Sequence, residues 1–292
     1  MQKVLDQLLQ QYRRFKRSVF LMVLLLAAAA VCVFINRMLT FAIIGAAVLY
    51  HMFCLRKLQK QYTGTFADVN IKMTLGKDIG TDSVTTESGG SITEETVKKA
   101  QMVPFDDRKG SCLLREGLAG ESNGMQVACC DAVLAETFQL VKKGKNRIHY
   151  LTGVWVSYEL DGDTGADWRL LDKDVLPVPI RQNFYQGMSS LKKVSMDGAE
   201  SERFILYSRN GSVPDHKLMK DIIALAEYTP GKLAISLRGN RLNIFIRDRI
   251  IARSVSVKEP PTMDKLMFHP FPEIKYTTQC AKRCQKLVRE QA

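Results

Sequence analysis

The sequence predicts an α+β protein in which a two-helix transmembrane hairpin precedes a cytoplasmic domain with a largely antiparallel sheet and a few helices. Three observations predict it. Two long apolar runs stand near the N-terminus, alternating apolar and polar residues recur after residue 110, and Gly239-Asn240 joins two alternating runs. Alternation with period two is typical of half-buried strands, and a two-residue Gly/Asn loop is typical of an antiparallel hairpin.

The apolar runs cover residues 18–35 and 39–55, and neither contains Asp, Glu, Lys or Arg. A helix crossing the hydrocarbon core needs roughly 20 apolar residues, with about 17 to 25 tolerated. One helix through both runs would carry Arg37 at its centre, where a charge costs about 2.5 to 3.5 kcal/mol. We therefore predict two membrane helices with a tight turn around Arg37. The alternatives are a buried helical core and a signal peptide cleaved near Cys32.

The flanking Lys and Arg residues predict the orientation of this hairpin. Positive residues stay on the cytoplasmic side of a membrane, and the turn itself carries only Arg37. Both termini are therefore predicted to be cytoplasmic and the turn to lie outside. The topology-determining cations are Arg13, Arg14, Lys16, Arg17, Arg56, Lys57 and Lys60.

The formal net charge of +12 does not indicate a nucleic-acid partner. Residues 1–60 hold nine Lys and Arg against Asp6 alone, whereas the remaining chain holds 33 basic and 29 acidic residues. Most of the excess therefore belongs to the membrane surface, where anionic lipid attracts each cation by about 1 kcal/mol. The lipid bilayer is the predicted partner of this region.

Four segments follow from these patterns. Residues 1–62 combine an amphipathic N-terminus with the hairpin, and residues 63–92, rich in Gly, Ser, Thr and Asp, predict a flexible tether. Residues 93–274 are the α+β domain, and residues 275–292 form a basic C-terminal helix or tail. The apolar face of residues 1–17 can lie on the inner leaflet, extend the first membrane helix or pack on the soluble domain.

Within the α+β domain, Ser91 or Thr93 is positioned to cap a helix that begins with two glutamates. A second helix begins near Pro214, and Gly153 marks a bend or a close approach within its strand. A groove beside the exposed edge of the last hairpin is predicted to accept a partner strand. The predicted strands are 111–120, 125–137, 147–160, 168–174, 202–208, 232–238 and 241–247.

Seven cysteines without a regular framework are typical of a reducing cytoplasm. Cys129 and Cys130 are predicted on opposite faces of a strand, and a Cys-dependent hydrolase would combine one of them with His149 and Asp131. No motif that marks a nucleophile or a phosphate-binding loop accompanies them. We therefore predict no catalytic residues, no cofactor and no metal, and the reactivity of the two thiols stays open.

The loop "DGDTGADWRLLD" offers weak metal-binding candidates, Asp161, Asp163 and Asp167, at alternating positions that partly match a calcium loop. Ala166 occupies the position where the sharp turn of such a loop needs glycine. A solvated β-turn is therefore the favoured interpretation.

The stretch from Glu202 to Ile250 resembles the C-terminal half of DUF3137, a bacterial family of membrane proteins of unknown function. The resemblance rests on a strand ending in a Tyr-Ser pair, a helix and a hairpin, and it implies a bacterial inner-membrane location and no catalytic residues. The chain departs from the family at Arg209 and Asn210, where an acidic residue is usual. The matching residues are Phe204, Tyr207, Ser208, Leu218, Met219, Leu225, Asn240 and 242–246.

Together these patterns predict a non-catalytic binding or scaffold module at the cytoplasmic face of a bacterial inner membrane, with a membrane or cytoplasmic protein as partner. The alternatives are a membrane-tethered enzyme of unrecognised class and an oligomeric pore or transporter accessory subunit. Small residues in the second apolar run permit close helix packing, within the hairpin or in a homo-oligomer. They are Ala42, Gly45, Ala46 and Ala47.

Overall fold

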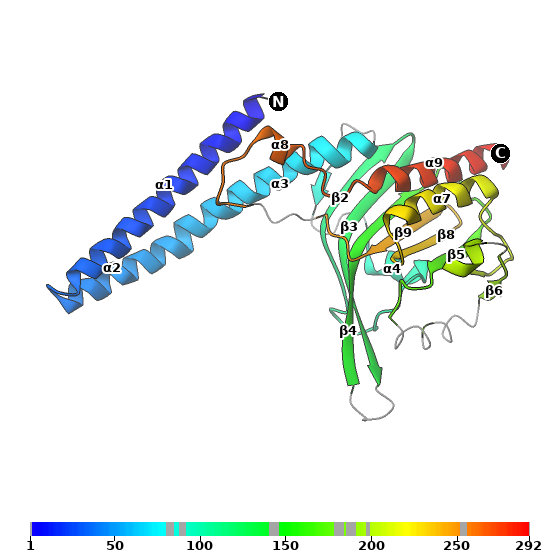
Figure 1. Cartoon of the computed structure of the whole chain (residues 1–292), viewed down its shortest axis with the longest axis horizontal. Coiled ribbons are helices and arrows are strands. Elements are labelled where there is room, and N and C mark those ends of the chain that lie inside the picture. The colour runs from blue at the N-terminus through cyan, green and yellow to red at the C-terminus, as the bar shows by residue number, and fades with distance from the viewer. Residues whose placement is uncertain are drawn as a thin grey trace. The chain divides into compact units, whose positions relative to one another are not determined.

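The structure, a computed structural model, describes residues 2–79, 85–87, 92–139, 146–177, 184, 191–196, 199–251 and 256–291. The chain divides into two compact units (Figure 1). The hairpin unit comprises Met1–Thr74 and Arg253–His269, and the sheet unit comprises Leu75–Ala252 and Pro270–Ala292. The boundary falls within a long helix, so each unit is described by itself.

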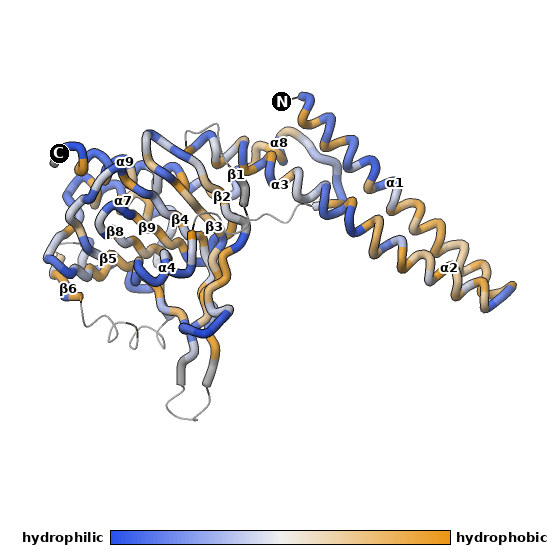
Figure 2. Tube along the Cα trace, turned by 180° about the vertical axis from the view of Figure 1, so that it is seen from behind, coloured by the Kyte–Doolittle hydropathy of each residue, from blue (hydrophilic) through white to orange (hydrophobic). Residues whose placement is uncertain are grey.

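The hairpin unit is built from two long helical stretches. The first is α1, Gln2–Cys32, and the second runs without interruption through α2, Arg37–Tyr50, a π-helical turn η1, His51–Leu55, and α3, Arg56–Ile79. Both are long and apolar enough to cross a membrane. Figure 2 shows apolar residues along the part of the hairpin nearest its turn and polar residues nearer the N-terminus.

The turn of the hairpin lies slightly earlier than predicted. Residues 33–35 form it, and Arg37 is the first residue of α2. The cause is Asn36, whose side-chain oxygen accepts hydrogen bonds from the backbone N–H of Met38 at 2.9 Å and of Leu39 at 3.3 Å. An Asn at this position satisfies the free N–H groups of a helix start. Farther along the hairpin, a hydrogen bond between the hydroxyls of Ser18 and Tyr50 joins α1 to α2.

The predicted flexible tether is wrong for residues 63–79, which are helical and belong to α3. The threonines do not break the helix, because the hydroxyls of Thr63 and Thr65 donate to the carbonyls of Gln59 and Gln61, four residues back. Burial of Phe66 adds a tertiary reason for helix. Within the remaining part of the predicted tether, residues 85–87 form strand β1 and the others lie largely outside the described residues.

Residues 256–268, which we call the strap, pack against the helices of the hairpin unit. They include the short helix α8, Met263–Leu266. The buried amide of Asn70 donates hydrogen bonds to the carbonyls of Leu266 at 2.7 Å and Phe268 at 2.8 Å. The hydroxyl of Tyr12 on α1 also donates a hydrogen bond to the strap, at the carbonyl of Lys258. The apolar cluster beneath the strap contains Val4, Leu5, Leu8, Tyr12, Tyr62, Phe66, Val69, Val257 and Leu266.

This cluster decides between the alternatives for residues 1–17. They continue the first apolar helix, because α1 is one helix, and their apolar face is buried by α3 and the strap. Leu8 is fully buried and Phe15 nearly so. The face is therefore used inside the protein and is not free to lie on a lipid surface.

The described residues of the sheet unit form one nine-stranded sheet in the order β1-β2-β3-β4-β9-β8-β5-β7-β6, and all neighbours are antiparallel. The predicted α+β class with an antiparallel sheet is confirmed. The strands are β1 Thr85–Glu87, β2 Cys112–Ser122, β3 Met125–Gln139, β4 Asn146–Glu159, β5 Asp167–Asp172, β6 Lys192–Val194, β7 Phe204–Ser208, β8 Leu233–Arg238 and β9 Arg241–Arg247.

Strand β9 lies between β4 and β8, in the middle of the sheet. The predicted partner-strand groove at the edge of the last hairpin is therefore wrong, because both edges of β9 are already paired. The described edge strands, β1 and β6, each contain three residues. Short edges of this kind give a foreign strand little to pair with.

Helices cover both faces of the sheet (Figure 1). One face carries α7, His216–Tyr228, and α9, Ile274–Gln291, and the hydroxyl of Tyr158 anchors α9 through hydrogen bonds with Thr277 and Thr278. The other face carries α4, Glu94–Ala100, over a core that includes Trp155 and Phe245. The short helix α6, Ala199–Arg203, precedes β7. The predicted basic C-terminal segment is thus a helix whose buried side holds Cys280 and Cys284.

Candidate functional site

Seven exposed cations flank the apolar parts of the hairpin unit. On α1 they precede Ser18, and on α3 they follow Leu55. Because α1 and α2 run antiparallel and their hydroxyls meet at Ser18 and Tyr50, both groups of cations lie at the same end of the apolar length. We call this set the collar: Arg13, Arg14, Lys16, Arg17, Arg56, Lys57 and Lys60.

The apolar length beyond the collar matches a bilayer. Residues 18–35 in helical geometry would span about 27 Å at 1.5 Å per residue, against a hydrocarbon core of about 30 Å. Large apolar side chains on this part are exposed, with Phe34 at 91% and Phe41 at 71%. An exposed apolar length that ends in a ring of cations is what an anchor in a lipid bilayer requires.

The sheet unit holds a groove between the C-terminal end of α4 and the turn from β8 to β9. Its volume is about 370 Å³. Lys99, Arg238 and Arg241 line it, and no carboxylate does. We call it the α4 groove. The remaining lining residues are Thr96, Ala100, Gly239, Asn240 and Asn243.

Hydrogen bonds hold the cations of the α4 groove in place. The guanidinium of Arg241 donates to Glu159 at 2.7 Å and to the hydroxyl of Thr96 at 3.4 Å. Arg238 donates to the carbonyl of Lys99 at 3.3 Å. Each guanidinium carries five N–H donors, so these bonds leave donors for a ligand.

A second cluster of charge lies next to the α4 groove. Arg169 is fully buried and donates from Nε to the carbonyl of Ala100 at 3.1 Å. Its partner carboxylate, Asp167, also lies 3.3 Å from Arg209 and 3.9 Å from Arg238. Burial, followed by repulsion from Arg238 and Arg209, lowers the pKa of Arg169 to about 10. One carboxylate therefore faces more positive charge than it can neutralise.

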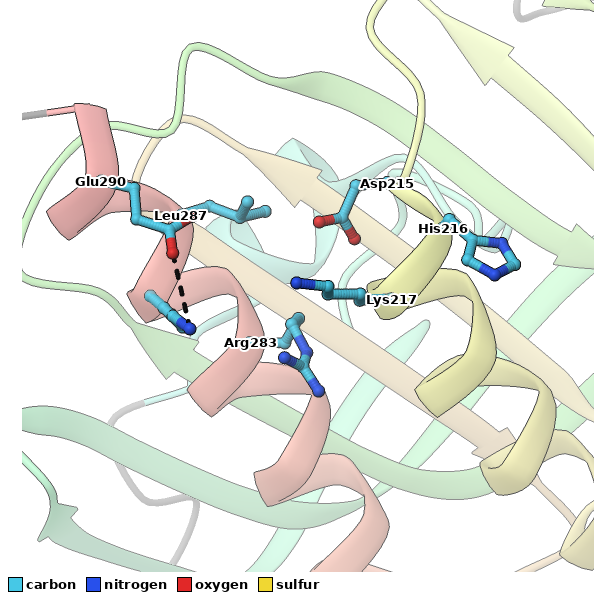
Figure 3. A pocket seen from close by; sticks show the side chains of 7 residues that line it. Asp215, His216, Lys217, Arg283, Leu287 and Glu290 are labelled. Carbon is cyan, nitrogen blue, oxygen red and sulfur yellow. Dashed lines mark ion pairs between the residues drawn. The ribbon is translucent and has the colours of Figure 1, made fainter.

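A different groove separates α7 from α9, with a volume of about 270 Å³. Figure 3 shows Lys217 pointing into the space between the helices and His216 pointing away from it. Its charges are of both signs and have local partners. Asp215 caps α7 by accepting from the backbone N–H of Leu218, and Arg283 lies 3.1 Å from Asp221. This balance distinguishes it from the α4 groove.

The weak metal candidates do not converge in the structure. Asp161 lies 3.6 Å from Arg289, and Asp163 accepts from the backbone N–H of Gly165 at 2.7 Å within its own turn. Asp167 lies among arginines, as described above. Within the described residues, no group of three His, Cys, Asp or Glu side chains is arranged to hold a metal ion. The loop is a turn that this ion pair and this hydrogen bond stabilise.

The Cys-dependent hydrolase has no assembled site either. Cys130 pairs across the ladder with Trp155, whereas His149 is six residues farther along β4, about 20 Å away at the rise of a strand. Asp131 accepts from the backbone N–H of Ile251 at 2.6 Å. The predicted opposite orientation of the two adjacent cysteines is confirmed, since both are buried in one strand with alternating side chains.

We expect iodoacetamide to leave four cysteines unmodified in the folded chain. Burial raises the pKa of Cys130 and of Cys284 to about 12, above the ordinary value of 9.0, and it raises the pKa of Cys129 and Cys280 as well. A buried thiol that stays protonated is a poor nucleophile. Mass mapping of alkylated peptides, before and after unfolding, measures this. Rapid modification of Cys129 or Cys130 in the folded chain at pH 8 would contradict it.

No family model matches the chain, and no curated protein matches it. A solved structure that is similar to the chain is the crystal structure of the mycobacterial trehalose monomycolate transport factor A, TtfA. The identity is 9% and the TM-score 0.33, and the match covers 74% of this chain and 93% of that chain. The resemblance to DUF3137 stays a prediction.

Sequence reasoning found the collar but missed the α4 groove and the strap. Lys99 and Arg241 are far apart in the chain, and only the position of α4 over β8 and β9 brings them together. Asn243 gave no signal, because a polar residue in an alternating strand is read as solvent-facing. The strap's apolar Val257 and Leu266 stand among prolines and charges without a period.

Proposed function

We propose that the chain is a membrane-anchored, non-catalytic binding protein that holds its sheet unit at the cytoplasmic face of a bacterial inner membrane. The observation that carries this proposal is the hairpin, in which two exposed apolar helices end at one collar of cations. In water, an apolar surface of this extent would drive aggregation. In a bilayer it is covered by lipid, and the collar lies at the anionic headgroups.

A binding role is supported by the surface of the sheet unit. Figure 1 shows that the β3–β4 hairpin extends beyond the body of the sheet. On β4, Ile148 is 53% exposed and Tyr150 is 59% exposed, and both lie on one face because they are two residues apart. Exposed apolar side chains on a protruding hairpin are suited to contact a protein partner. A membrane or cytoplasmic protein is the proposed partner.

The anchor and its orientation are tested with reporters in the full chain. We expect alkaline phosphatase, which is active only when exported, to be active when inserted after Phe34 and inactive when fused after Ala292. The matched control replaces the seven collar cations with serine, and we expect it to lose the fixed orientation because the positive flank is gone. Activity of the fusion after Ala292 in the unaltered chain, or extraction of that chain by alkaline carbonate, would contradict the proposal.

The binding role is tested by photo-cross-linking in cells. A photoreactive amino acid at Tyr150 is expected to give one defined protein adduct on the full chain, because the partner contacts this face. The comparison position is Lys220, which is exposed on the outer side of α7. An adduct at Lys220 alone would show that the partner contacts α7 and not the β3–β4 hairpin. The absence of adducts at both positions would count against a stable protein partner.

A further inference from the structure

The α4 groove differs in charge from three other cavities of the sheet unit. Lys99, Arg238 and Arg241 line it without a carboxylate. Each of these three cavities has at least one: Asp215 in two of them and Asp174 in the third. The carboxylates that pair with these cations, such as Glu159, do not line the groove. An anion placed there would meet three cations in the lining, although each cation also has a carboxylate nearby: Glu95 for Lys99, Asp167 for Arg238 and Glu159 for Arg241.

The floor of the groove also contains a polar side chain. Asn243 is only 2% exposed and lines the groove. Its side-chain oxygen accepts from Nε1 of Trp155 at 3.3 Å, which orients the amide group. The amide nitrogen of Asn243 is a hydrogen-bond donor, so it can contribute to the binding of a ligand in the groove.

The sheet register extends this polar floor under α4. Asn243 pairs with Ser236, and Ser236 pairs with Arg169 on the next strand. Ser236 is fully buried, and its hydroxyl has no hydrogen-bond partner among the described residues. Arg169 adds positive charge at the end of this row. A polar row that ends in excess positive charge favours an anionic ligand.

We propose that the α4 groove binds the phosphate group of a phosphorylated ligand. Guanidinium groups present paired N–H donors that match phosphate oxygens, and lysine adds a point charge. The volume of about 370 Å³ suits a small ligand. The phosphate can belong to a soluble phosphomonoester or to a lipid headgroup, and both share this chemistry. The site goes beyond the proposed scaffold role and does not depend on the protein partner.

The experiment titrates inorganic phosphate into the full chain in dodecyl maltoside, an uncharged detergent, and measures heat by calorimetry. We expect saturable binding of one phosphate per chain. Arg238→Gln with Arg241→Gln removes two cations from the groove and is expected to weaken binding at least tenfold. The matched control, Lys217→Gln with Lys286→Gln, removes the same charge from the α7–α9 groove and is expected to change the affinity less than twofold. Thermal unfolding checks that both variants fold.

A second variant tests the site without changing the arginines, so a loss of stability in the arginine variant does not decide the result. Asn243→Asp retains the acceptor for Trp155 and replaces the amide donor with a negative charge, so we expect it to abolish phosphate binding while the full chain still folds. Displacement of phosphate by glycerol 3-phosphate would identify a soluble ligand, and displacement by short-chain phosphatidylglycerol would identify a headgroup. Either result retains the site. An absence of saturable binding, or equal losses in both double variants, would overturn it.

Discussion

Replacing Gly153 with alanine is expected to destabilise the sheet unit by about 3 kcal/mol. A Cβ atom at this position would lie 2.4 Å from the carbonyl oxygen of Ile246 and 2.7 Å from the ring of Phe245. The carbonyl belongs to the neighbouring strand β9, so it cannot move without breaking the β4–β9 ladder. The fluorescence of Trp155 and Trp168 during urea unfolding reports this loss, because both tryptophans lie in the sheet unit.

The control for this substitution is Gly64→Ala in α3. A Cβ atom at Gly64 would meet nothing within 4 Å. Alanine in a helix interior is about 1 kcal/mol more favourable than glycine, so we expect no loss of stability. If Gly153→Ala unfolded at the same urea concentration as the unaltered chain, this result would contradict the close approach of β4 to β9 at Gly153.

Replacing Asn70 with alanine is expected to release the strap from the hairpin unit. The amide of Asn70 holds the carbonyls of Leu266 and Phe268, and its removal leaves both without their side-chain donor. The loss of a hydrogen bond at a buried carbonyl such as that of Leu266 costs about 1 to 3 kcal/mol. We therefore expect trypsin to cleave the full chain after Lys265 at least tenfold faster in the variant, as followed by mass spectrometry.

Thr74→Ala is the matched control for the strap. Thr74 lies one turn farther along α3, is equally buried, and donates only to the carbonyl of Asn70 within the same helix. We expect its cleavage rate after Lys265 to stay within twofold of that of the unaltered chain. Similar acceleration in both variants would mean that helix stability, and not the Asn70 contact, retains the strap.

Local signals predicted the elements whose stabilisation is local. Thr93 caps α4 and Asp215 caps α7 because their side chains accept from backbone N–H groups three residues on. The Gly239-Asn240 turn joins β8 and β9 because glycine accepts a φ of +60° without strain. In each case the decisive interaction lies within a few residues, so the sequence pattern contains it.

The misjudged segments depend on partners that are distant in the chain. The composition of residues 63–79 favours a loop, yet aromatic packing stabilises a helix at the start of this segment. The ring of Tyr62 lies 5.6 Å from that of Tyr12, and the ring of Phe66 lies 6.3 Å from that of Tyr62, measured between centroids. The position of β9 within the sheet follows from its pairing with β4, which no local pattern specifies. The α4 groove combines both problems, because it joins a helix to a turn that follows seven intervening strands.

The strap sets an order of events during biosynthesis. The helices of the hairpin unit leave the ribosome first, but residues 256–268 follow only after every strand of the sheet has been made. In the finished protein, Leu266 packs in the same apolar cluster as Leu8 and Tyr62. Until the strap has been made, this part of the cluster is exposed. The hairpin unit therefore has an uncovered apolar surface until the chain has been completed as far as the strap.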